Sequence, residues 1–118
     1  MKDEVYWVFT LDVKPENFDA FKALVSQIVA ATAKEPGVLT YEYSVDNDGR
    51  TVNIFERYKD SDSFISHVEE TFAKFAERFL ELASVTRFVV YGEPTAAARV
   101  KLDSFGAIYM KTFDGFRR

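Results

Sequence analysis

A single histidine is the side chain of this sequence best suited to moving protons. Histidine gains and loses a proton most readily near neutral pH, and the chain has one, His67. On a helix, His67 would lie one turn from Phe64 and from Thr71, at the border of an apolar stripe. We therefore predict that His67 is a general base. The alternative is a half-exposed helix residue without a catalytic role.

Glu56 and Tyr58 form the second candidate group, because they alternate along a predicted strand with the apolar residues Val52 and Ile54. Burial disfavours the charged form of a carboxyl group and raises its pKa, which makes it a more useful base. We predict that Glu56 assists proton transfer and that Tyr58 donates a proton or stacks on a ligand. The alternatives are an ion pair between Glu56 and an arginine, within the chain or across a dimer, and a packing role for Tyr58.

Aromatic side chains offer rigid walls for a flat ligand. The candidates for substrate binding are Trp7, Tyr41, Tyr43 and Phe72, with Asn53 as a polar strand residue that could hydrogen-bond a substrate oxygen. The chain has 12 Phe, 6 Tyr and 1 Trp, so most of its aromatic side chains must belong to an ordinary core. The alternative for each of these residues is therefore packing or, for Asn53, exposure to solvent.

The composition excludes several classes of function. The 118 residues fit one domain, and without cysteine the chain has no disulfide, thiolate nucleophile, Fe–S cluster or Cys-ligated zinc. A single histidine cannot build a multi-histidine metal site within one chain, so no metal site is predicted. The net charge of −4 and the lack of a basic stripe argue against nucleic acid as a partner.

Neither a signal peptide nor a membrane span is predicted. The N-terminal residues Met1 to Glu4 are charged and lead into an alternating strand-like segment. The apolar runs are far shorter than the roughly 20 residues that a membrane helix needs. We expect a soluble, cytoplasmic protein that does not associate with membranes.

The hydrophobic periodicity changes between strand and helix along the chain. Alternation predicts strands at 5–13, 38–46, 51–59 and 85–91, and Asp48-Gly49 predicts a hairpin turn between the second and third of these. Helical spacing predicts helices from Pro15 to Pro36, over 60–82 with an interruption near 69–71, and over 96–102 with Thr95 as the cap. Residues 105–118 are predicted to be irregular.

The order β-α-β-β-α-β predicts an α+β, ferredoxin-like fold with a four-stranded antiparallel sheet and both helices on one face. We assign residues 1–93 to this domain and 94–118 to a C-terminal extension. Apolar side chains on the uncovered face predict a homodimer in which the two sheets face each other. The extension is rich in aromatic residues, so we expect it to pack on the body or on the partner subunit.

Two segments carry a resemblance to a known family: Glu35 to Tyr43 (EPGVLTYEY), and Ile54 to Asp60 (IFERYKD) followed by Phe64 and His67. They resemble the antibiotic biosynthesis monooxygenase domain, in which a Glu-x-aromatic pattern on the third strand precedes a helical histidine by about nine residues. Tyr58 and His67 have this separation. The resemblance covers residues 5–91 and implies a dimeric α+β barrel.

The resemblance also implies a function. Some members of this family oxidise quinols or polycyclic phenols with O₂ and use no cofactor, and others degrade haem. We therefore expect a cofactor-independent monooxygenase acting on a small aromatic substrate, and the alternative is a non-catalytic dimeric module that binds a small hydrophobic ligand. Haem degradation ranks third, because Trp7, His67 and Glu77 stand at or near the positions used in that branch and glutamate is a poor ligand for haem iron.

Overall fold

The computed structural model describes residues 3–118 and contains one five-stranded sheet. The strands run β2-β3-β1-β4-β5 across the sheet, and all neighbours are antiparallel except β4 and β5. Their bounds are β1 (Val5–Asp12), β2 (Val38–Val45), β3 (Thr51–Tyr58), β4 (Ser84–Gly92) and β5 (Ile108–Met110). The first four strands have the order of the predicted ferredoxin-like fold, which is confirmed.

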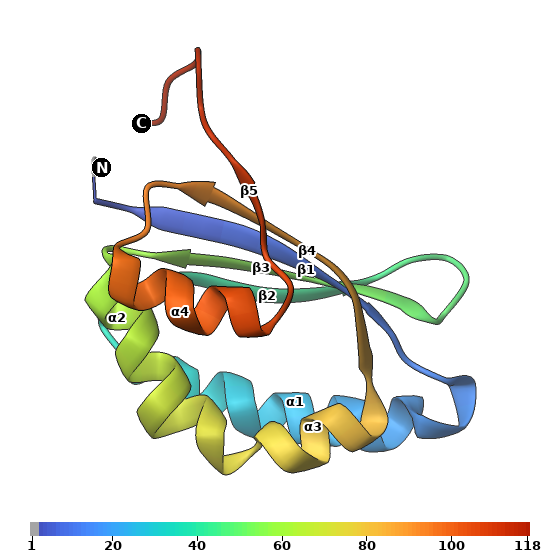
Figure 1. Cartoon of the computed structure of the whole chain (residues 1–118). Helices are drawn as coiled ribbons and strands as arrows, with labels where there is room; N and C mark the ends of the chain where they lie inside the picture. The colour runs from blue at the N-terminus through green and yellow to red at the C-terminus, as the bar shows by residue number, and fades with distance from the viewer. Residues whose placement is uncertain (1–2) are drawn as a thin grey trace.

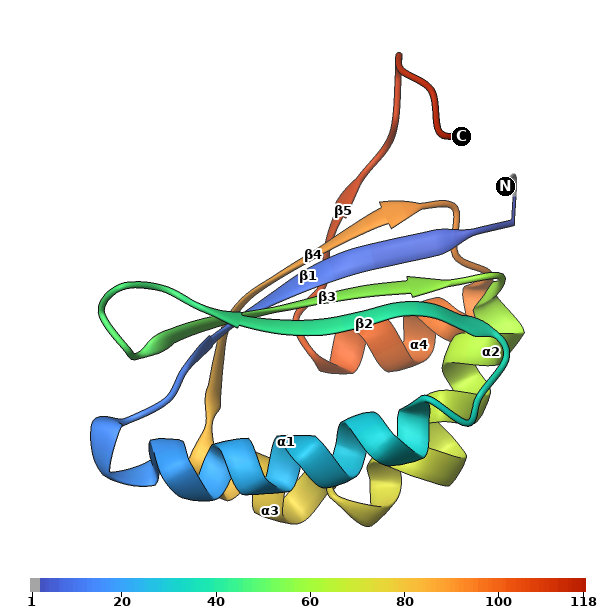
Figure 2. The same ribbon diagram turned by 180° about the vertical axis from the view of Figure 1, so that it is seen from behind.

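The helices gather on one face of the sheet and leave the other face uncovered by helix (Figure 1; Figure 2). A 3₁₀ turn at Pro15–Asn17 leads into α1 (Phe18–Thr32), whose residues Phe21, Leu24 and Ile28 are buried at helical spacing. They pack on the sheet residues Leu11 and Val52. None of the helices within residues 3–118 has the length and apolar character needed to cross a bilayer.

The second helical region is broken into four pieces. They are α2 (Ser61–Ser66), a π-helical turn (His67–Thr71), a 3₁₀ turn (Phe72–Lys74) and α3 (Ala76–Leu82). Asp60 starts α2 by accepting a hydrogen bond from the Ser63 N–H at 2.8 Å. In the π-helical turn, the Phe72 N–H reaches back five residues to the His67 carbonyl. The interruption predicted near 69–71 coincides with this wider turn, a feature that often occurs at functional sites.

The first part of the C-terminal extension packs on the domain. Thr95 caps α4 (Ala96–Ser104) by accepting from the Ala98 N–H, and Ala98 and Leu102 are fully buried against the sheet. The prediction that residues 105–118 are irregular was wrong for β5, which pairs in parallel with β4 and widens the sheet from four strands to five. The open edge of β4 supplies the unpaired backbone groups that this short strand satisfies.

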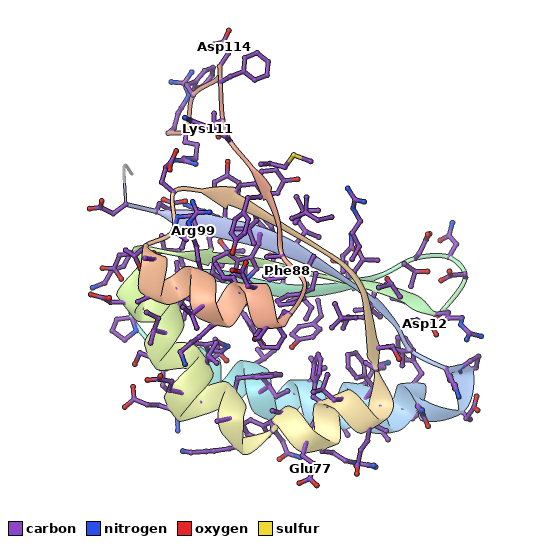
Figure 3. The ribbon with its side chains drawn as sticks, in the orientation of Figure 1. Asp12, Glu77, Phe88, Arg99, Lys111 and Asp114 are labelled. Atoms are coloured by element: carbon purple, nitrogen blue, oxygen red, sulfur yellow. The ribbon has the colours of Figure 1, made fainter. Side chains whose placement is uncertain are left out.

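The last residues form an arm that leaves the sheet and turns back at its end, where the Arg117 guanidinium lies 5.0 Å from the centre of the Tyr6 ring. In Figure 3 Lys111 and Asp114 lie on this arm, beyond the sheet. Phe113 is 98% exposed and Phe116 is 79% exposed. Phe105 and Tyr109, earlier in the extension, do pack on the core. Packing of the arm on a partner subunit therefore stays a prediction.

Candidate active site

A cavity opens between the sheet and the π-helical turn. It lies between the hydrophobic cluster that packs around α1 and the cluster that packs around Trp7 and α4. Its side chains leave it narrow: the cavity volume is about 40 Å³, room for a few water molecules. Its lining is aromatic and aliphatic apart from a carboxyl, an imidazole and a phenol. The lining residues are Phe9, Tyr41, Ile54, Glu56, Phe64, His67, Val68, Phe72, Val85 and Phe105.

Strand alternation places Glu56 in this cavity. Val52, Ile54, Glu56 and Tyr58 point to the helix-covered face and are all buried. The Tyr58 hydroxyl donates to Glu56 Oε1 at 2.5 Å. The neighbouring Arg57 does not pair with Glu56, because it points to the opposite face and pairs with Glu4 at 2.7 Å. A pair between Glu56 and an arginine across a dimer stays a prediction.

Burial dominates the protonation of Glu56, which is only 4% exposed. Loss of solvent raises the pKa of this carboxyl, and the positive charge that His67 can carry and the hydrogen bond from Tyr58 act in the opposite direction. The indole N–H of Trp7, opposite Glu56 in the β1–β3 ladder, also favours the carboxylate, although it lies outside hydrogen-bond geometry. Glu56 is thus a carboxyl that keeps its proton to higher pH than an exposed glutamate does.

His67 is held at the opposite side of the cavity by the π-helical turn. It is 3% exposed, so the half-exposed position of the alternative is wrong, and its catalytic role stays a prediction. Its ring lies 5.4 Å from the Tyr41 ring and 5.7 Å from the Tyr58 ring, measured between centroids. Its Nδ1 lies 2.9 Å from Glu35 Oε2. With Nδ1 occupied, Nε2 is the ring nitrogen left for a ligand.

The phenols around the cavity are neutral hydrogen-bonding groups. Burial raises the pKa of Tyr41 and of Tyr58 well above the usual value for tyrosine, and the negative charge of Glu56 adds to the effect. The Tyr41 and Tyr43 hydroxyls bond to each other at 2.9 Å. Tyr41, the tyrosine in the cavity lining, can offer a hydrogen bond to a ligand oxygen, but these phenols do not supply an anion.

The predicted substrate-binding residues do not all meet at the cavity. Tyr41 and Phe72 line it. Trp7 is fully buried behind it, against Tyr58 and Phe64. Tyr43 lines a separate surface hollow beside α1, and Asn53 is exposed on the opposite face of the sheet. The structure therefore brings together His67, Glu56, Tyr58, Tyr41 and Phe72, and leaves Tyr43 and Asn53 apart from them.

Glu35 is the site residue that the sequence did not single out. It lies in the turn after α1, and its side chain reaches the imidazole of a residue 32 positions later. The only local signal is its place before Pro36-Gly37, in a segment noted for its resemblance and not for its chemistry. A contact of this kind depends on how the end of α1 packs beside the π-helical turn, which residue spacing does not reveal.

The site does not resemble a haem site. Glu77, the residue nearest to the haem-ligand position, is exposed on α3 and points away from the sheet (Figure 3). Within residues 3–118, no three His, Asp or Glu side chains come together in a way that could hold a metal ion. What the cavity offers is proton transfer beside a flat apolar surface.

Comparison with known proteins places this chain in a family. The family model for antibiotic biosynthesis monooxygenases matches residues 5–78, which carry every polar residue of the cavity. No curated protein matches the chain.

Several solved structures share the fold. MupZ from Pseudomonas fluorescens is 24% identical, with a TM-score of 0.86 over 98% of this chain and 94% of its own. SnoaB from Streptomyces nogalater, a cofactor-independent oxygenase, is 18% identical, with a TM-score of 0.65 over 80% of this chain and 96% of its own. A conserved protein from Methanosarcina mazei Go1 is 21% identical, with a TM-score of 0.71 over 78% of this chain and 94% of its own. The chain belongs to the antibiotic biosynthesis monooxygenase family.

Proposed function

We propose that this protein is a cofactor-independent monooxygenase that oxidises a quinol or a polycyclic phenol with O₂ in the cavity at His67, whose aromatic walls move apart to admit the substrate. The observation that carries this proposal is the cavity itself, in which a buried imidazole and a buried carboxyl face each other across aromatic walls. The family membership supports oxygenase chemistry, and the similarity to SnoaB, described as a cofactor-independent oxygenase, supports the lack of a cofactor.

The proposed reaction begins with proton transfer. Nε2 of His67 takes the phenolic proton, because the phenolate gives up an electron to O₂ far more readily than the phenol does. One oxygen atom then forms a bond to a ring carbon of the substrate. The O–O bond breaks and the second oxygen leaves as water, with both hydrogens and all electrons supplied by the substrate. Glu56 and protonated His67 line the cavity and are the groups that can return protons to the peroxide, while Tyr58, outside the lining, donates a hydrogen bond to Glu56.

The direct test is O₂ consumption by the purified protein with a panel of hydroquinones and fused-ring phenols. We expect uptake above the uncatalysed rate without any added flavin, haem or metal, and with a chelator present. Because hydroquinones oxidise spontaneously, the blank must be subtracted at each pH. If no substrate exceeds the blank while aromatic ligands still bind, the protein is a binding module and the proposal is wrong.

We also propose that two copies assemble through the face of the sheet that the helices leave uncovered. This face carries Tyr6, Val8, Phe55 and Tyr91, and the Tyr6 and Tyr91 rings stack on it at 5.3 Å. A stable interface of this kind buries about 1,600 Å² or more in total.

Light scattering at micromolar concentration is expected to give the mass of a dimer. Val8→Glu places a charge on the uncovered face and should yield monomers, because a buried, unpaired charge is costly. Leu80→Glu is the matched control, since Leu80 is exposed on α3, in the helical layer. A monomeric mass for the unaltered protein would contradict the assembly.

A further inference from the structure

We propose that Glu35 is the positioning residue of this site: it holds His67 in the tautomer with the proton on Nδ1, so that Nε2 presents its lone pair to the cavity. That Nε2 takes its proton from a phenolic substrate rests on the proposed function. The tautomer of the neutral ring rests on the geometry alone. Nothing in the sequence pattern assigns this role to Glu35.

The tautomer follows from the partner. A neutral imidazole carries one N–H, and an ionised carboxylate can only accept a hydrogen bond. The 2.9 Å contact between His67 Nδ1 and Glu35 Oε2 therefore favours the proton on Nδ1. When Nε2 takes a second proton, the same carboxylate stabilises the imidazolium that forms, because a charge-assisted hydrogen bond is stronger than a neutral one.

Backbone hydrogen bonds fix the turn that carries Glu35. The Glu35 N–H donates to the Thr32 carbonyl at 2.9 Å, and its own carbonyl accepts from the Val38 N–H at 3.1 Å. The Gly37 carbonyl accepts from the Lys59 N–H at 2.9 Å, which ties the turn to the end of β3. A Cβ on Gly37 would lie 2.2 Å from Ser63 Oγ, so glycine is what lets this turn approach the start of α2.

The other polar groups that face His67 do not replace Glu35. Glu56 on β3 acts through its charge, and its Oε1 is taken by the Tyr58 hydroxyl. The Tyr41 hydroxyl is engaged with Tyr43. Among residues 3–118, Glu35 is thus the carboxylate hydrogen-bonded to the ring, and its side chain is 20% exposed at the surface end of the contact. Replacing it leaves the core of the domain intact.

The test uses nuclear magnetic resonance on the intact protein without substrate, because the chain's single histidine gives an unambiguous ¹⁵N signal. At a pH where the ring is neutral, we expect the ¹⁵N shifts to report a protonated Nδ1. In Glu35→Ala the acceptor is gone, and the signal should move towards the Nε2-protonated form. Glu35→Gln keeps a carbonyl acceptor and should retain the Nδ1-protonated form while lacking the charge.

Activity gives a second reading of the same variants. We expect kcat to fall about 10-fold or more in Glu35→Ala, with a smaller loss in Glu35→Gln and little change in KM in either, because the carboxylate orients the base without touching the substrate. Glu70→Ala is the matched control, since Glu70 lies exposed on the π-helical turn and bonds to Ser66.

The two readings separate the positioning role from the proposed reaction. If Glu35→Ala keeps the Nδ1-protonated ring, the positioning role is overturned, whatever the activity. If the tautomer shifts as expected but the unaltered protein consumes no O₂ above the blank, the positioning role holds and the proposed oxygenation fails.

Discussion

His67→Ala is expected to lower cofactor-free O₂ uptake by about 100-fold or more, the scale on which a positioned general base acts. The imidazole is buried in the cavity wall, and no other side chain there combines a free nitrogen with an anionic partner behind it, within the part of the chain that the structure describes. Oxygen-electrode measurements on the unaltered protein and the variant, with the uncatalysed rate subtracted, give this result.

The control for this variant is the state of the protein. His67→Ala removes a ring that packs among Tyr41, Tyr58 and Phe72, so its circular dichroism and its mass must match those of the unaltered protein. Unchanged uptake in a folded variant would show that His67 is not the base. Glu56, whose pKa burial raises, would then be the next candidate.

Ending the chain at Glu93 is expected to abolish or strongly weaken cooperative unfolding. The truncation deletes α4 and β5, and with them the fully buried Ala98 and Leu102 that pack beside Trp7 and Phe88. Burying one large apolar side chain contributes about 1.5–3 kcal/mol, against a total stability of about 5–15 kcal/mol for a typical domain. The truncation also removes Phe105 from the cavity wall.

A shorter truncation separates the role of α4 from that of the arm. Ending the chain at Met110 removes only exposed residues, so the melting temperature at low protein concentration should change little. If the arm packs on a partner subunit, this variant should dissociate at higher concentration than the full chain. Equal melting temperatures for the full chain and the protein ending at Glu93 would show that the extension does not support the fold.

Much of the fold could be predicted because its elements repeat strong local patterns. Alternation along β1 and β3 and the apolar stripe of α1 each extend over eight residues or more, and the structure follows them. β5 escaped prediction because it has three residues and depends on the free edge of β4, which is a tertiary feature.

The candidate site was less predictable. Glu56 and His67 could be found from residue type alone, because a carboxyl on an apolar strand face and a lone histidine are unusual. The parity of β3 already places Asn53 opposite to Glu56, since their separation of three residues puts them on different faces. The partner of His67 could not be found in this way, because Glu35 reaches it from the turn after α1, which tertiary packing brings beside the π-helical turn.

The uncovered sheet face has a consequence for how this chain can change over evolutionary time. Consecutive residues of β3 serve separate tasks: Glu56 lines the cavity and accepts a hydrogen bond from Tyr58, while Phe55 and Arg57 belong to the outer surface. Point substitutions in this strand can therefore change the cavity without changing the outer surface, or the reverse. A one-residue deletion within β3 has the opposite effect, because it would exchange the two sets of side chains between the faces and disrupt both traits at once.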